Sequence, residues 1–186
     1  MNCSLEKTIA FHCAPALVGI KPANLISCDL KQHPKLEEEV CALNRSLNVR
    51  GLYFRIVCRM EGRVLMLVYR VQVLGKHLED AQVLAFLKKA GYAGGDMEAM
   101  ILQLQKRLSA SREFPHETGV FLGYPVEDVE GFLRDGGKHC RLSGYWKVYV
   151  NEDQTRDLFK KFTLCRKTLY LLVSNGVSIV QLFQAA

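Results

Sequence analysis

The chain lacks the short motifs that mark the commonest nucleotide-binding and hydrolytic sites. Its 186 residues contain no G-x-x-x-x-G-K-[ST], no G-x-G-x-x-G after a predicted strand, no H-E-x-x-H and no G-x-S-x-G. These absences remove the sequence support for a P-loop, a Rossmann cofactor site, a standard zinc protease and a nucleophile-elbow hydrolase. The function has to be sought in less familiar combinations of residues.

Long apolar runs and paired cysteines are also missing. Charges or glycine interrupt every apolar run before the roughly eighteen residues that a membrane-spanning helix needs. The seven cysteines are odd in number, include no C-x-x-C pair and follow no apolar leader-like segment, so a secreted disulfide framework is not indicated. We therefore expect a cytoplasmic protein with reduced thiols.

Length and charge set few limits on function. With 186 residues, 49% of them hydrophobic, the chain is large enough to bury a core without crosslinks, and we expect a single domain over residues 1–186. The net charge of +6 is spread along the chain. It permits an anionic partner without requiring one, and it leaves the oligomeric state open.

The residue patterns predict an α+β fold, with a small, mostly antiparallel sheet covered by several helices. Strands are predicted at residues 8–13, in a hairpin over 52–73 that turns at Glu61-Gly62, at 119–122 and at 144–150. Helices are predicted after Pro34, at 78–90, 96–108 and 153–174, and in a short final segment.

The stretch "FPHETGVFLGYPVEDVEGF", Phe114 to Phe132, is unusually rich in acids, prolines and glycines. Pro125 can open a helix whose first turn carries Glu127 and Asp128, where carboxylates favour the positive end of the helix dipole. Helical spacing turns Val129, Phe132 and Leu133 inward. His116 and Glu117 have no such structural explanation, so we expect them to face a cleft.

Four segments together resemble the domain-of-unknown-function 3793 family of anaerobic Firmicutes. They are "FHCAPALVGIKPANL", "FPHETGVFLGYPVEDVEGF", "GYWKVY" and "LCRKTLY", and the similarity extends over nearly the whole chain. The resemblance implies an uncharacterised protein of the cytoplasm of anaerobic bacteria and no particular activity. Ser143 stands where members of this family often have cysteine, which argues against a metal site that depends on that cysteine.

One candidate chemistry pairs Cys13 with His116. A thiol becomes a nucleophile when an imidazole or a helix N-terminus stabilises its thiolate, and Glu117 or Asp128 can orient the imidazole. A cysteine before a helical segment and a later histidine before a glycine-rich segment loosely resemble papain-like hydrolases, which implies a thiol-dependent hydrolase or transferase. On this hypothesis Cys13 reacts with iodoacetamide faster than Cys58 or Cys165.

A second candidate is a metal, haem or iron site. Thiolate and imidazole ligands suit zinc and iron, although their spacings in this chain match no standard ligand pattern. The candidate ligands are His12, Cys13, Cys28, His116 and Cys140.

A third candidate is a polyanion or nucleic-acid surface on the hairpin. The alternation of side chains in a strand places Arg55 and Arg59 on one face with Tyr53. No recognised nucleic-acid motif accompanies them, which favours an edge kept soluble by its charge. The arginines near the hairpin are Arg50, Arg55, Arg59, Arg63 and Arg70.

Three separate segments thus carry polar or reactive residues that local patterns leave unexplained, and we expect them to converge on one ligand-binding cleft. Cys13 and His116 would lie within a few ångströms of each other there. The cofactor or ligand itself is not specified by the sequence. The other residues expected at this cleft are His12, Glu117, Lys21, Lys147 and Tyr149.

Overall fold

The computed structural model describes residues 4–110 and 114–184. The chain divides into two compact units, one formed by Met1–Leu74 with Leu164–Ala186 and the other by Gly75–Thr163. Two helices, α3 (Val71–Leu78) and α8 (Glu152–Ser174), contribute to both units. The single domain predicted over residues 1–186 remains a prediction. The α+β class, with a small antiparallel sheet and many helices, is confirmed.

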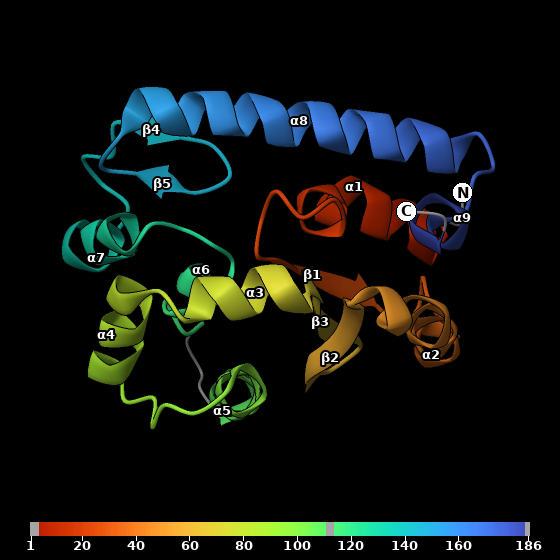
Figure 1. The fold of residues 1–186 in the computed structure, drawn as a ribbon, viewed down its shortest axis with the longest axis horizontal. Coiled ribbons are helices and arrows are strands. Elements are labelled where there is room, and N and C mark those ends of the chain that lie inside the picture. The colour runs from red at the N-terminus through yellow and green to blue at the C-terminus, as the bar shows by residue number, and fades with distance from the viewer. Residues whose placement is uncertain (1–3, 111–113, 185–186) are drawn as a thin grey trace. The chain divides into compact units, whose positions relative to one another are not determined.

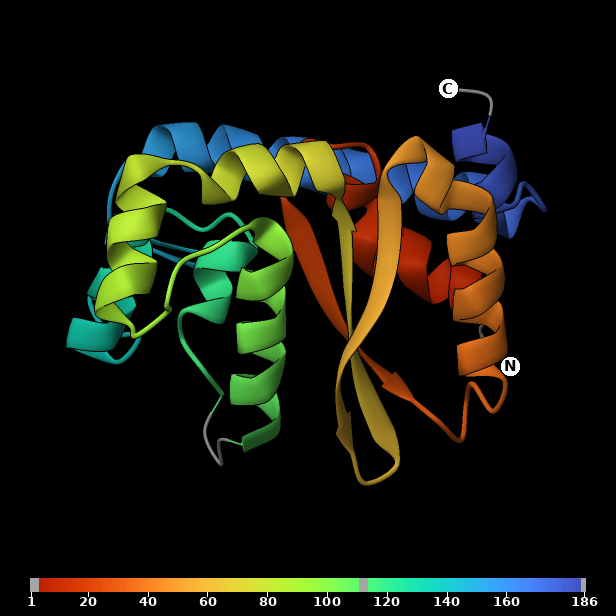
Figure 2. The same cartoon turned by 60° about the horizontal axis from the view of Figure 1, so that its bottom comes forward.

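The first unit contains a three-stranded antiparallel sheet in the order β1-β3-β2 (Figure 1). The strands are β1 (Ala23–Asp29), β2 (Leu52–Met60) and β3 (Arg63–Arg70). Figure 2 shows the three strands side by side, with β3 in the middle. The hairpin of β2 and β3 confirms the prediction from the alternating pattern, whereas β1 follows a proline- and glycine-containing segment that gave no clear signal.

One face of this sheet carries the core of the first unit. Side chains of β3 such as Met66 and Val68 pack there with α1 (Leu5–Leu17), α2 (Leu36–Leu47), the end of α8 and α9 (Ile179–Gln184). The buried stripe of α2 and the short final helix agree with the sequence prediction. The buried helical side chains in this core include Ile9, Cys13, Leu43, Leu47, Leu169 and Ile179.

The prediction of a strand at residues 8–13 is wrong, because this segment lies within helix α1. Leu5, Ile9 and Cys13 recur every fourth residue and are all buried, which is the spacing of a helix face. The hydroxyl of Ser4 accepts the N–H of Lys7 at 3.3 Å and caps the N-terminus. Pro15 lies in the last turn of α1.

Pro15 has no N–H to offer the carbonyl of Phe11, four residues earlier. The Nε of Arg166 on α8 donates to that carbonyl at 2.7 Å. Its guanidinium also lies 4.2 Å from the centre of the Phe11 ring. A side chain from another helix therefore supplies the hydrogen bond that the proline removes.

A β-bulge between Ile56 and Cys58 changes the faces of the hairpin. Arg55 lies opposite Leu67, but Arg59 lies opposite Val64, three residues away on β3, so the two arginines point to opposite faces. The prediction that they share a face is wrong. Arg59 forms an exposed ion pair with Glu37 instead.

The end of β3 leads directly into α3 at Val71, so the strand predicted over residues 52–73 is too long. The second unit continues with two helices that match the predicted segments at 78–90 and 96–108. These are α4 (Ala81–Lys89) and α5 (Met97–Ala110). Asp80 caps α4, with its carboxylate accepting the N–H groups of Gln82 and Val83.

The strand predicted at residues 119–122 is a helical turn, α6 (Thr118–Phe121). All four of its residues are buried, whereas a strand on one sheet face would alternate. The helix expected after Pro125 is confirmed as α7 (Val126–Asp135). The predicted strand at 144–150 is reduced to β5 (Lys147–Val148), which pairs with β4 (Leu142–Ser143).

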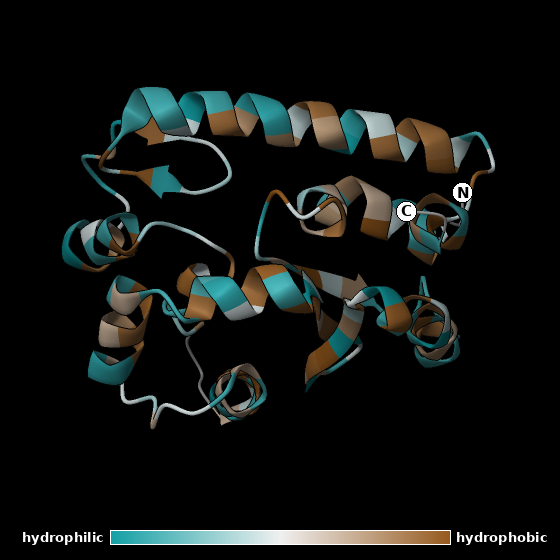
Figure 3. Ribbon diagram, viewed as in Figure 1, coloured by the Kyte–Doolittle hydropathy of each residue, from teal (hydrophilic) through white to brown (hydrophobic). Residues whose placement is uncertain are grey.

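The helix predicted at residues 153–174 is confirmed as α8, whose character changes along its length. Figure 3 shows a mainly hydrophilic N-terminal half and a more hydrophobic C-terminal half. In the latter, Leu164 and Leu171 are 66% and 60% exposed. No helix within the described residues has both the length and the apolar content needed to cross a bilayer.

Candidate functional site

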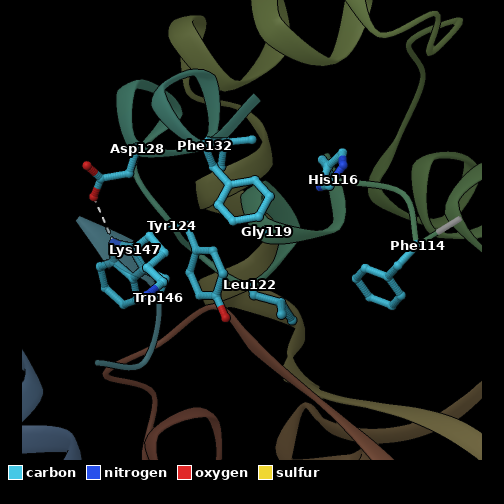
Figure 4. A pocket seen from close by; sticks show the side chains of 10 residues that line it. Phe114, His116, Gly119, Leu122, Tyr124, Asp128, Phe132, Trp146 and Lys147 are labelled. Carbon is cyan, nitrogen blue, oxygen red and sulfur yellow. Dashed lines mark hydrogen bonds between the residues drawn. The ribbon is translucent and has the colours of Figure 1, made fainter. Parts of the chain in front are cut away.

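A cavity of about 270 Å³ lies within the second unit, between α6, α7 and the strand β5. It is formed by the two segments that sequence analysis singled out, "FPHETGVFLGYPVEDVEGF" and "GYWKVY". Figure 4 shows that aromatic side chains form much of its wall. The residues around this cavity, called here the aromatic pocket, are Phe114, His116, Gly119, Leu122, Tyr124, Asp128, Val129, Phe132, Trp146 and Lys147.

The Tyr124 ring lies against the backbone of Gly119. A Cβ atom at residue 119 would come within 2.8 Å of the Tyr124 ring, closer than atoms can pack. Gly123 has a φ of +77°, which turns the chain between α6 and the tyrosine. The Tyr124 ring then stacks on Trp146 with 4.8 Å between the ring centres. The glycines of this segment thus bring two aromatic rings together.

Asp128 fixes the position of Trp146 in the wall of the pocket. Its Oδ2 accepts the indole N–H of Trp146 at 2.7 Å, and its Oδ1 accepts the backbone N–H groups of Tyr149 and Val150 at 2.7 and 3.1 Å. The Asp128 side chain is buried and joins the first turn of α7 to the segment around β5. The sequence placed this carboxylate at a helix N-terminus but did not reveal its partners.

Gly131 provides room for the Tyr149 ring on the other side of α7. A Cβ atom at residue 131 would lie 2.5 Å from Cγ of Tyr149. Tyr149 therefore holds α7 against β5 with its ring and its backbone, and it does not line the aromatic pocket. Leu133, expected to face inward, is 52% exposed, so that prediction is wrong.

His116 and Lys147 provide the positive or hydrogen-bonding groups of the pocket. The His116 ring is exposed and packs against Phe132 with 5.3 Å between ring centres. Nζ of Lys147 donates to Oγ of Ser143 at 2.9 Å, and within the described residues it has no carboxylate partner. Two residues predicted from separate segments therefore lie at one cavity.

Glu117 is engaged elsewhere in the second unit. It forms an ion pair with Arg107 at 3.0 Å, and the same guanidinium donates to the carbonyl of Ala90 at 2.6 Å. The Arg107 group also lies over the Tyr92 ring. Burial and the neighbouring Glu117 carboxylate raise the pKa of the Tyr92 hydroxyl. Glu117 thus belongs to a structural ion pair and does not line the aromatic pocket.

Cys13 lies in the first unit, where α1, the following loop and β1 bring it together with Lys21 and Cys28. All three side chains are almost fully buried. Burial raises the pKa of the Cys13 thiol, with a smaller opposing effect from Lys21. Burial also raises the pKa of Cys28 to about 11 and lowers the pKa of Lys21 to about 8. Because the thiolate is the nucleophile, these shifts oppose thiol chemistry at Cys13.

The five proposed metal ligands are divided between the units. His12 lies on the exposed side of α1, facing away from the buried Cys13, and Cys140 lies in the second unit. No group of three or more His, Cys, Asp or Glu side chains that could hold a metal ion is present among residues 4–110 and 114–184. The cysteines in these ranges form no disulfide, and Cys3 lies outside them.

Four of the residues expected at one cleft lie in two pairs, each within one unit. Cys13 and Lys21 lie together in the first unit, and His116 and Lys147 lie together in the second. The proximity of Cys13 to His116 therefore remains a prediction. The sequence predicted the aromatic pocket only in part, because its wall is formed by contacts between residues that are far apart in the sequence.

Comparison with known proteins agrees with the resemblance seen in the motifs. Residues 9–183 match the model of the family described as "Protein of unknown function (DUF3793)". No curated protein and no solved structure matches the chain. Since the matched region covers most of the sequence and includes the whole aromatic pocket, the chain belongs to the DUF3793 family.

Proposed function

We propose that the protein binds a small planar anion in the aromatic pocket. The observation that carries this proposal is the set of rings around one cavity, in which Trp146 is held by a buried carboxylate. Aromatic faces favour planar ligands that can stack on them or contact them edge to face. A cavity of about 270 Å³ is slightly below the range of about 300–1,000 Å³ that is usual for ligand sites, so the ligand must be small.

The charged groups favour a negative ligand. Lys147 uses one of its three N–H donors on Ser143, which leaves two for a ligand oxygen. His116 can donate one further hydrogen bond. Both oxygens of Asp128 accept N–H groups from the protein, and these dipoles offset part of its negative charge. An aromatic or heteroaromatic carboxylate combines the required flat ring and negative group.

The proposal uses His116 and assigns no part to Cys13. It therefore keeps the ligand-binding function expected from the sequence and moves its centre to residues around α6, α7 and β5. Binding to this pocket requires neither a metal ion nor a reactive thiol.

Trp146 is the only tryptophan in the chain, so its fluorescence reports directly on this pocket. We would titrate the protein with benzoate, its neutral analogue benzamide and the non-planar cyclohexanecarboxylate. Benzoate should change the fluorescence with saturation, and the other two should bind at least about tenfold more weakly, since each lacks one recognised feature. Equal responses to all three compounds, or none to benzoate, would contradict the proposal.

Variants separate the pocket from general effects of charge. Lys147→Met should weaken benzoate binding about tenfold or more. Lys138→Met, at an exposed position in the same unit, removes the same charge outside the pocket and should leave the affinity unchanged. If both variants lose affinity equally, the attraction is not specific to this site.

A further inference from the structure

A second cavity lies in the first unit, where the sheet meets its flanking helices. Its volume is about 620 Å³. It lies between the short 3-10 helix η1 (Asn48–Arg50), the start of β2, the junction of β3 with α3, and α9. The residues around it, called here the arginine pocket, are Asn48, Val49, Arg50, Gly51, Tyr53, Arg70, Val71, Gln72, Val73 and Phe183.

Two guanidinium groups line this pocket. Nη2 of Arg50 donates to the carbonyl of Gln184 at 2.6 Å, and Nε of Arg70 donates to the carbonyl of Leu17 at 2.7 Å. Within the described residues neither arginine has a carboxylate partner. Each guanidinium has five N–H donors, so most donors of both groups are left for a ligand. Two positive charges that have no carboxylate partner among the described residues thus adjoin one cavity.

The contacts of Arg70 hold it in place. Its guanidinium lies 5.5 Å from the centre of the Phe183 ring, and its Cδ approaches Gly19, where a Cβ would be only 3.4 Å away. Partial burial removes some of the water around its charge and lowers the pKa of Arg70. A positioned and partly desolvated guanidinium interacts more strongly with an anion than a mobile surface charge does.

The backbone adds further donors at the same place. The N–H of Val71 donates to the carbonyl of Gly51 at 2.9 Å, which fixes the start of the eight-residue helix α3. The following N–H groups, of Gln72 and Val73, belong to the first turn of α3 and have no acceptor within the helix. Gln72 and Val73 line the pocket, so the first turn of α3, which is the positive end of its helix dipole, lies beside the pocket.

We propose that the arginine pocket binds the phosphate group of a small phosphorylated molecule. The guanidinium groups of Arg50 and Arg70 bind the phosphate oxygens, and the first turn of α3 provides backbone N–H donors. The cavity leaves room for an attached organic group beside Tyr53. This site is independent of the aromatic pocket, which lies in the other unit and selects for planar carboxylates.

The geometry favours a small molecule over a nucleic acid. Of the five arginines near the hairpin, only Arg50 and Arg70 line the pocket. Arg59 lies on the face opposite Arg55 and pairs with Glu37. The arginines therefore do not form the continuous basic surface that a phosphate backbone needs.

Calorimetric titration of the full chain with ribose 5-phosphate, inorganic phosphate and ribose, at constant ionic strength, tests the proposal. Ribose 5-phosphate and inorganic phosphate should bind, and ribose should not. Arg50→Met should weaken both interactions about tenfold or more, since it removes charged hydrogen bonds. Arg63→Met removes an exposed arginine of the same hairpin outside the pocket and should bind as the wild type does.

Two further variants keep the test decisive. Arg50→Lys retains the charge without the planar fork, so it should recover only part of the affinity lost in Arg50→Met. Lys147→Met should bind ribose 5-phosphate as the wild type does, because Lys147 belongs to the aromatic pocket. The absence of phosphate binding by the wild type, or an equal loss in Arg50→Met and Arg63→Met, would overturn the proposal.

Discussion

The carboxylate of Asp128 accepts the indole N–H of Trp146 at 2.7 Å, across eighteen residues of sequence. The same carboxylate accepts two backbone N–H groups from the segment after β5. Asp128 therefore connects the two sequence segments that form the aromatic pocket, and it determines where the only tryptophan lies.

Asp128→Asn should destabilise the protein. An amide places an NH2 group against at least one of the three N–H donors, so hydrogen bonds are lost and a buried donor is left unpaired. We expect the free energy of unfolding to fall by about 2–4 kcal/mol in a denaturant titration. Glu127→Gln makes the same chemical change at the neighbouring exposed position and should alter the stability by less than about 0.5 kcal/mol. Equal effects would show that Asp128 has no special structural role.

Two glycine-to-alanine changes should have opposite effects. Alanine normally stabilises a helix interior by about 1 kcal/mol relative to glycine. Gly75→Ala in α3 should follow this rule, because the nearest atom to the new Cβ would be the sulfur of Met97, at the ordinary contact distance of 4.0 Å. Gly131→Ala should destabilise, because its Cβ would overlap the Tyr149 ring. Thermal unfolding of the two variants measures the difference, and stabilisation by Gly131→Ala would refute the close packing of α7.

Arg166 and Pro15 should be coupled through the carbonyl of Phe11. Arg166→Met should cost about 1–2 kcal/mol of stability in the wild type, because it leaves that carbonyl without its hydrogen bond. The cost should be smaller in a Pro15→Ala background, where residue 15 regains an N–H for the same carbonyl. A double-mutant cycle measures this coupling. Strictly additive effects would contradict it.

Cys13 should be among the slowest thiols to react in the native protein, in contrast to the expectation from the sequence. It is fully buried and its pKa is raised, and Cys28 shares both properties. Cys41 is exposed and should be alkylated first by iodoacetamide at pH 8. Peptide mapping after short exposure gives the order, and denaturation should then reveal all seven thiols as free. Rapid native labelling of Cys13 would instead support the thiol hypothesis.

Lys21→Met should stabilise the protein in a pH-dependent way. Lowering the pKa of Lys21 from 10.5 to about 8 corresponds to a cost of about 3 kcal/mol for burying the ammonium group. The folded-state pKa lies below the unfolded-state value, so this cost is complete below pH 8 and declines as the pH rises toward 10.5. The advantage of the variant over the wild type should shrink accordingly between pH 7 and about 9 in denaturant titrations.

Lys31→Met, at an exposed position, controls for the loss of one positive charge. If the stability advantage of Lys21→Met over the wild type grew with pH, this would contradict a lowered pKa for Lys21.

Periodicity in the sequence was sufficient to predict the helices and strands whose exposed and buried faces differ clearly. The stripe of α2 and the alternation of the hairpin predicted both elements, whereas the segment 8–13 was interpreted as a short buried strand although its buried residues have helical spacing. The bulge at Val57 and the buried turn α6 leave no periodic signal, since adjacent residues are buried together. Such features depend on tertiary packing, which local patterns do not encode.

The residues of the aromatic pocket, like the elements of the fold, were predicted only in part from the sequence. His116 and Lys147 were identified because their local patterns gave them no structural role, and both line the aromatic pocket. Tyr124 and Trp146 were not identified as site residues, because aromatic residues are usually core residues. Their contact depends on Gly119 and Asp128, which come close to them only in the folded chain.

The most direct test of ligand binding is the NMR spectrum of ¹⁵N-labelled protein during a benzoate titration. The single indole N–H of Trp146 gives one resonance, and Gly119 gives a backbone amide resonance at the same pocket. Both should shift with saturation, at one common dissociation constant, while the amide of Gly19 in the first unit should not move. Unchanged Trp146 and Gly119 resonances at saturating benzoate would contradict a ligand site in the aromatic pocket.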